Sequence, residues 1–196
     1  MANRSYLYTA NHFPESPEWE NKRDLHSISE WSYDIPLVFK LLLSGNPVAV
    51  KSSIWETPEK IALAGDFKAG FHALEMYLSR LPHEAEPLVN EATAFLSKTS
   101  NQRRYFILEC GEIFDMEAGS LEARNLALLD EIQLLRNEIS TIDVPKAPSP
   151  KTSIRGIIDK LLSRKQEVSQ IDPLKPFYGI GLGNWSNILY FQFSEE

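Results

Sequence analysis

The chain has 196 residues, a length typical of a single domain, and 43% of them are apolar, which excludes a disordered chain. Its formal net charge is −7, and a chain of this sign repels nucleic-acid phosphates, so we expect it to bind no nucleic acid. The single cysteine, Cys110, excludes an internal disulfide and a cysteine-based zinc cluster.

The first predicted elements are a strand, a long loop, a helix and a second strand. Residues 4–10 read "RSYLYTA", a tyrosine-rich pattern typical of a strand. Residues 11–29 contain prolines and many charges, which indicates a long exposed loop. Residues 33–47 predict a helix with Asp34 as its N-cap, and residues 48–52 predict a short strand.

Two further helices are predicted before residue 82. Residues 57–66 have Thr57 at a cap position and Gly65 at a stop position, which indicates a short helix. Asp66 can cap the next helix, which extends to Leu81. Its apolar residues recur with helical spacing and form an amphipathic stripe: Phe67, Phe71, Leu74, Leu78 and Leu81.

The middle of the chain predicts helix, strand and helix. Residues 86–99 indicate a helix, residues 103–110 a buried strand, and residues 111–119 an acidic turn. Ser120 can cap a long helix over residues 121–140. Two sets of residues repeat by seven in it: Leu121, Leu128 and Leu135, and Asn125, Ile132 and Ile139. This repeat is too short for a coiled coil and favours a core-facing helix, with a homodimer built on it as an alternative.

The C-terminal part completes an α+β fold. Three prolines make residues 143–152 an exposed linker between a main domain, 1–142, and a C-terminal part, 153–196, that returns to the main sheet. Within that part we expect a helix at 153–164 and a strand at 187–194. We therefore predict one α+β domain with a small sheet of three or four strands packed with five or six helices.

The sequence predicts a cytoplasmic protein that does not enter a membrane. The N-terminus, "MANRSYLYTA", has no apolar run of signal-peptide length. The longest apolar stretch, residues 35–43, is interrupted by Lys40 and is far shorter than the roughly 20 residues of a membrane span. One cysteine in the chain also agrees with a reducing compartment.

The glycine stretch "GIGLG", residues 179–183, could be a phosphate loop or a bend before the last strand. The spacing differs from a dinucleotide loop, and a strand rather than a helix is predicted after it. The stretch therefore favours a bend or close packing, and we expect no cofactor.

An enzyme or ligand-binding site near Glu109, Cys110, Glu112 and the 179–183 stretch is one alternative for the function. Paired carboxylates could perform acid–base chemistry, and a thiol of lowered pKa could be a nucleophile. A small buried cysteine and a solvated acidic turn are the simpler interpretation, and no histidine pair has metal-ligand spacing. We therefore expect no metal site and no enzymatic activity.

The other alternative is a protein-binding surface. The loop over residues 12–34 combines tryptophans with acids, as binding hot spots do, although its aromatic residues could instead pack on the core. Residues 61–150 contain 14 acidic and eight basic residues, and their negative field favours a basic partner. The predicted partner-binding residues are Glu15, Glu18, Trp19, Glu20, Trp31, Glu112, Asp115 and Glu117.

Several stretches resemble an uncharacterised family of small bacterial cytosolic proteins: "ANRSYLY" at 2–8, "YDIPLVFKLLLSGNP" at 33–47, "KIALAGDF" at 60–67 and the closing "NILYFQF". The resemblance covers most of the chain and implies no catalytic residues. Small acidic domains of this type are often immunity proteins, which neutralise a toxin by binding it. The leading hypothesis is therefore an immunity or antitoxin-like protein whose partner is a cognate, basic toxin effector domain.

Overall fold

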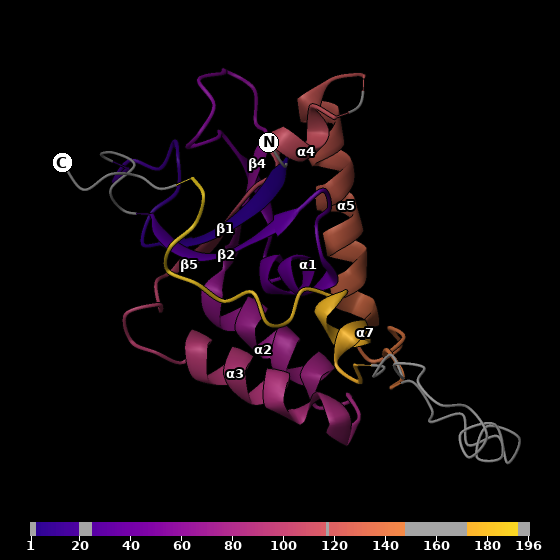
Figure 1. Cartoon of the computed structure of the whole chain (residues 1–196). Helices are drawn as coiled ribbons and strands as arrows, with labels where there is room; N and C mark the ends of the chain where they lie inside the picture. The colour runs from indigo at the N-terminus through magenta and orange to yellow at the C-terminus, as the bar shows by residue number, and fades with distance from the viewer. Residues whose placement is uncertain (1–2, 20–24, 117, 148–171, 192–196) are drawn as a thin grey trace, which may run out of the picture.

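The computed structural model describes residues 3–19, 25–116, 118–147 and 172–191 (Figure 1). Its strands are β1 (Arg4–Ala10), β2 (His26–Ser32), β3 (Val48–Val50), β4 (Ala62–Asp66) and β5 (Tyr105–Glu109). Its helices are α1 (Leu37–Leu43), α2 (Phe67–Leu78), the 3-10 helix η2 (His83–Ala85), α3 (Glu86–Leu96), α4 (Gly111–Phe114), α5 (Leu121–Glu138) and α7 (Lys175–Tyr178). Among the described residues, every helix is too short or too polar to cross a bilayer.

The strands form one antiparallel sheet in the order β2-β1-β5-β4-β3. The predicted α+β class is confirmed, and the sheet has five strands where three or four were expected. Because β5 lies between β1 and β4, the sheet joins the N-terminus to segments about 60 and 100 residues further along the chain.

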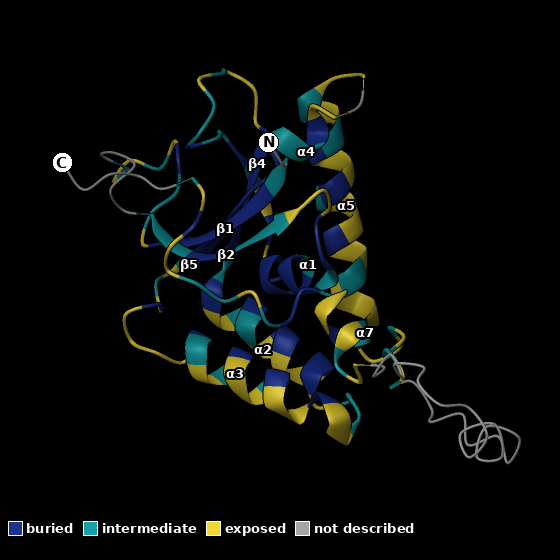
Figure 2. Ribbon diagram, in the orientation of Figure 1, coloured by how far each residue is buried: buried dark blue, intermediate teal, exposed yellow. Residues whose placement is uncertain are grey.

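Successive side chains along each strand point to opposite faces of the sheet, so the apolar residues divide between two cores. Leu7 of β1, Leu63 of β4 and Leu108 of β5 face the helices and belong to the larger, helix-side core. Figures 1 and 2 show α1 buried between the sheet and the outer helices, with exposed residues on α3 and α5. The largest side chains on the opposite face are Tyr6 and Tyr8, so we call it the tyrosine face. Loops cover this face instead of helices, through Phe13, Trp19, Leu25, Ile54 and Phe191.

Helix α2 packs unusually close to α1. As predicted, Asp66 caps α2, since its carboxylate accepts a hydrogen bond of 2.9 Å from the backbone N–H of Ala69. A Cβ atom at Gly70 would overlap the backbone carbonyl of Leu42, so only glycine permits this approach. The contact fixes the position of α2 over the sheet.

Helix α5 packs on the core with the register that its heptad pattern predicts. Ser120 caps it by accepting a hydrogen bond of 3.2 Å from the N–H of Ala123. Leu128 and Ile132 are buried, and Asn125 donates hydrogen bonds to backbone carbonyls at the start of β4. The core-facing role of this helix is confirmed.

The helix expected at 57–66 is wrong, because its second half is strand β4. Thr57, Pro58 and Gly65 resemble helix start and stop signals, but Ala62–Asp66 pairs with β5 on one side and β3 on the other. Alanine and glycine carry little strand preference of their own, so long-range pairing decides this segment.

The loop expected at 11–29 is also partly wrong, because β2 begins at His26. The helix expected at 33–47 is shorter, with Pro36 at its N-cap instead of Asp34, whose carboxylate binds the N–H of Ile35. The acidic turn after β5 contains the one-turn helix α4. The shorter helix α1 is a difference at an element boundary, where local signals are weakest, whereas β2 and α4 are elements that the sequence did not predict.

The C-terminal segment over residues 184–191 wraps around the edge of the sheet, and we call it the strap (Figure 1). Trp185 forms an isolated bridge with Ser29 of β2, and Leu189 and Phe191 lie on the tyrosine face. The strand expected at 187–194 is therefore not formed over 187–191, and the helix expected at 153–164 lies outside the described residues. The strap protects the outer edge of β2 around this bridge.

Candidate functional site

The predicted acid–base residue Glu109 is bound to its own chain. It is 1% exposed, and its two carboxylate oxygens accept hydrogen bonds of 2.6 Å each from the hydroxyl of Ser52 and the N–H of Ser53. Both donors come from the segment between β3 and β4. The carboxylate therefore anchors that segment to the tyrosine face.

Glu112 has a similar role at the same end of that face, beside the start of β1. Its carboxylate accepts hydrogen bonds from the backbone N–H of Arg4 at 2.9 Å and from the hydroxyl of Tyr6 at 3.1 Å. Burial first, and then the Glu112 charge, raise the pKa of Tyr6 well above its usual range. Glu112 thus joins α4 to β1, while Asp115 one turn later is exposed.

Cys110 is a core residue. It is 1% exposed in the helix-side core, and burial, followed by the nearby Glu109 charge, raises the pKa of its thiol well above the ordinary value. A nucleophilic cysteine needs the opposite shift, because the thiolate is the reactive form. The buried position of Cys110 is that of a small apolar core residue.

The glycine stretch packs against helices of the same chain and does not have the form of a phosphate-binding loop. Gly181 and Gly183 have φ angles of +100° and +89°, which favour glycine. A Cβ atom at Gly181 would lie 2.7 Å from Pro36, before α1, and one at Gly183 would lie 2.7 Å from the ring of Tyr178. The predicted bend and close packing are confirmed. The stretch has its contacts on α1 and α7, whereas Glu109 and Glu112 bind on the tyrosine face.

In the loop over residues 12–34, which was predicted to bind a partner, several side chains already contact other parts of the same chain. Glu15 lies 3.4 Å from the ammonium groups of Lys51 and Lys60, so its charge is compensated. Trp19 packs on the tyrosine face and Trp31 on the helix-side core, both half-buried. Glu18 remains exposed. Glu20 and Glu117 lie outside the described residues.

No group of three histidine, cysteine or carboxylate side chains could hold a metal ion within the ranges that the structure describes. His26 lies 3.1 Å from both Asn101 and Asn187, where it helps to fasten the strap. His83 pairs with Glu86 on the surface at 2.7 Å. These contacts give the histidines structural or surface roles.

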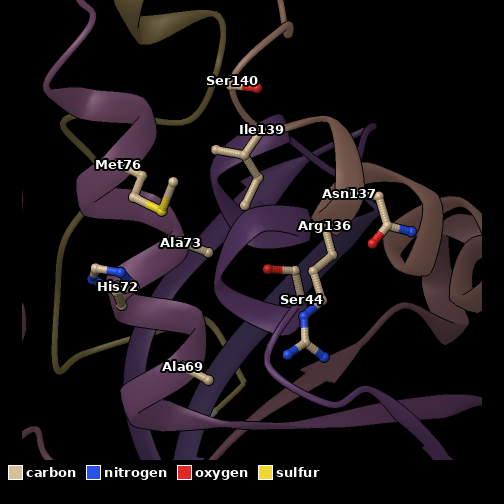
Figure 3. Close-up of a pocket in the computed structure, with 9 residues that line it drawn as sticks. All are labelled: Ser44, Ala69, His72, Ala73, Met76, Arg136, Asn137, Ile139 and Ser140. Carbon is tan, nitrogen blue, oxygen red and sulfur yellow. The ribbon is translucent and has the colours of Figure 1, made fainter.

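A hollow of about 280 Å³ lies between α2 and the end of α5 (Figure 3). We call it the α2–α5 groove, and its lining residues are Ser44, Ala69, His72, Ala73, Met76, Arg136, Asn137, Ile139 and Ser140. Figure 3 shows His72 and Met76 on α2, and Arg136, Asn137 and Ile139 on the opposite wall. The groove is open to solvent and combines an apolar floor with a few polar groups.

The amino-acid sequence explains why space remains there. Three residues with small side chains, Ser44, Ala69 and Ala73, line the groove and leave its space unfilled. Arg80, two residues after the end of α2, donates hydrogen bonds to the carbonyls of Ile139 and Ile142, the second at 2.7 Å. These bonds hold the end of α5 against α2, so the groove is formed without a partner.

Arg136 forms the rim of the groove nearest β3. Its guanidinium donates a hydrogen bond of 2.8 Å to the side-chain oxygen of Asn46. It also lines a shallower hollow of about 440 Å³ beside Val48, at the outer edge of the sheet. Arg136 thus stands between two adjoining concavities.

The groove was not predicted from the sequence, although one residue of α2 indicates it. Met76 lies outside the apolar stripe of α2 and is 45% exposed, so it is an apolar residue on a polar helix face. Exposed methionine and arginine are characteristic of protein interfaces. The spacing of Met76 and Arg136, 60 positions apart, gave no reason to connect them.

One comparison with known proteins gives a match. A family model described as "Domain of unknown function (DUF7822)" matches residues 11–145. Neither a curated protein nor a solved structure matches the chain. The matched range contains all the residues of the α2–α5 groove, whereas the strap lies beyond it.

Proposed function

The chain belongs to the DUF7822 family of domains of unknown function, and we propose that it binds a protein partner through the α2–α5 groove, as an immunity or antitoxin-like protein that neutralises a cognate toxin effector domain. The observation that carries this proposal is that exposed Met76 and Arg136 line the same groove from opposite sides, with Arg136 hydrogen-bonded to Asn46. A guanidinium that is already held by a hydrogen bond loses less side-chain entropy when it binds a partner.

The size of the groove favours a protein partner. Ligand pockets usually have volumes of about 300–1,000 Å³ and enclose most of the ligand. At about 280 Å³ and open to solvent, the groove can accept one or two side chains from a larger surface. Arginine is among the residues that supply much of the binding energy at interfaces, and methionine is enriched in them.

Exposed acids near the groove favour a basic partner. Glu75 follows His72 on α2, Glu138 ends α5, and both are exposed. Acids at the rim of an interface accelerate association with a basic protein more than they increase its affinity. Among the acids predicted as contacts, Glu18 and Asp115 are exposed but do not line the groove, so they have no part in this proposal.

The bonding of the other candidate groups supports binding over chemistry. Glu109 and Glu112 already accept hydrogen bonds from within the chain, and the Cys110 thiol is buried. The rival enzyme hypothesis needs at least one of them to reach a substrate.

The test compares two methionine variants. Met76→Glu places a charge in the groove, whereas Met116→Glu makes the same change at a methionine of similar exposure, 48%, beyond α4. Each variant and the wild type are used to capture proteins from the organism that makes the chain. A captured partner is then expressed alone, and together with each form, in a bacterial host.

We expect the partner alone to arrest growth, and the wild type and Met116→Glu to restore it. Met76→Glu should restore growth poorly. A partner that is harmless when expressed alone would rule out the immunity function, and equal rescue by both variants would rule out the groove.

A further inference from the structure

We infer that the α2–α5 groove recognises a partner segment that carries an aliphatic side chain with a carboxylate close to it. This inference rests on the proposed function, because the occupant is a segment of the bound protein. The aliphatic side chain fills the hollow, and the carboxylate binds the guanidinium of Arg136.

The apolar half of the site is the floor and wall of the groove. Ala69 and Ala73 form the floor, while Met76 and Ile139 stand on opposite sides. Methionine is unbranched and adapts to the shape of the group that it contacts. A leucine-like side chain would cover the exposed part of Met76, so burial of apolar surface contributes to binding.

The charged half of the site is Arg136. In the part of the chain that the structure describes, no carboxylate pairs with its guanidinium, although the whole chain has an excess of seven acids. The bond to Asn46 uses one of five N–H donors. The remaining donors match the two oxygens of a carboxylate, the partner that arginine binds in bidentate geometry.

The relative position of the two halves restricts the partner. Arg136 lines both the groove and the shallower hollow beside Val48, so a chain leaving the groove passes the guanidinium before it reaches the sheet edge. A carboxylate one or two residues from the aliphatic side chain would lie there. The exposed acids near the groove would repel a carboxylate that does not bind Arg136, so they make the pairing specific.

The test uses two small probes that share the aliphatic group and differ in charge. N-acetyl-leucine carries the carboxylate, and N-acetyl-leucinamide lacks it. The chain has three methionines, so their methyl groups give three NMR signals after selective labelling, and Met76→Leu identifies one of them. Titrations of both probes are followed on the wild type and on Arg136→Gln.

N-acetyl-leucine should shift the Met76 methyl signal in a saturable way while the other two methionine signals stay in place. Binding should weaken about tenfold, or roughly 1.4 kcal/mol, for the amide probe and for Arg136→Gln. Equal shifts with both probes, or no shift at Met76, would overturn the inference. These outcomes do not depend on a captured partner, so they separate failure of this inference from failure of the proposed function.

Discussion

The guanidinium of Arg136 and the side-chain amide of Asn46 are joined by a hydrogen bond of 2.8 Å, although 90 positions separate them in the chain. The bond links the last turns of α5 to the turn that precedes β3. Asn46 has a φ angle of +52°, a conformation that asparagine tolerates better than most residues. A strained turn therefore supplies the group that orients the cation of the groove.

Two substitutions at Asn46 should separate backbone strain from the hydrogen bond. Asn46→Gly removes the amide but accepts the positive φ angle, whereas Asn46→Ala removes the amide and is strained. We expect the free energy of unfolding to be lower for Asn46→Ala by about 1 kcal/mol than for Asn46→Gly. Urea denaturation measures the difference, and equal stability of the two variants would contradict the strained turn.

Gly70→Ala should destabilise the protein strongly. The added methyl group would overlap the Leu42 carbonyl, a backbone atom that can move only with α1. We expect a loss of roughly 3 kcal/mol, at the upper end of overpacking effects. Gly179→Ala adds the same methyl group at a helical position, 3.4 Å from the nearest atom, and should change stability by less than about 0.5 kcal/mol. A similar loss in both variants would mean that α1 and α2 are not packed this closely.

The Cys110 thiol should be unreactive in the folded protein. Burial and the raised thiol pKa leave little thiolate at neutral pH and no access for a reagent. A disulfide reagent should therefore label one thiol per chain in denaturant and almost none without it. Rapid labelling of the native protein would revive the enzyme hypothesis.

Stability should decrease at alkaline pH because of the tyrosine face. Burial, followed by the charges of Glu112 and Glu109 respectively, raises the pKa of Tyr6 and Tyr8 in the folded state. The unfolded value is about 10, so the contribution of the neutral phenols is complete below that pH and is lost as the pH rises above it.

The matched variant for this effect is Tyr8→Phe, which removes one buried phenol. Its free energy of unfolding should fall less steeply than that of the wild type between about pH 10 and pH 12. Identical slopes for the two proteins would show that Tyr8 ionises in the folded state as easily as in the unfolded state.

Elements with strong local signals were predicted correctly from the sequence. The capped helix α2 and the core register of α5 depend on patterns within one element, such as Asp66 before an apolar stripe. Strand β2 was missed because the prolines and charges before it indicate a loop, and β4 was missed because it is held by pairing with β5, about 40 residues further along the chain. Ala62–Asp66 has a helix-like composition and becomes a strand only between β3 and β5.

The candidate site was less predictable than the fold. The α2–α5 groove depends on the distance between α1 and α2, which Gly70 sets, and on the bond between Asn46 and Arg136. Neither contact leaves a pattern in a single sequence. The acids predicted as contacts were chosen by proximity along the chain, and the structure shows that Glu15 and Glu112 bind within the protein.

Binding of a protein partner at the α2–α5 groove is best tested by the dissociation constant of the captured partner for three forms of the chain. We expect Met76→Glu to weaken binding at least tenfold, or by about 1.4 kcal/mol, and Met116→Glu to stay within about twofold of the wild type. Equal dissociation constants for the wild type and Met76→Glu would contradict binding at the groove.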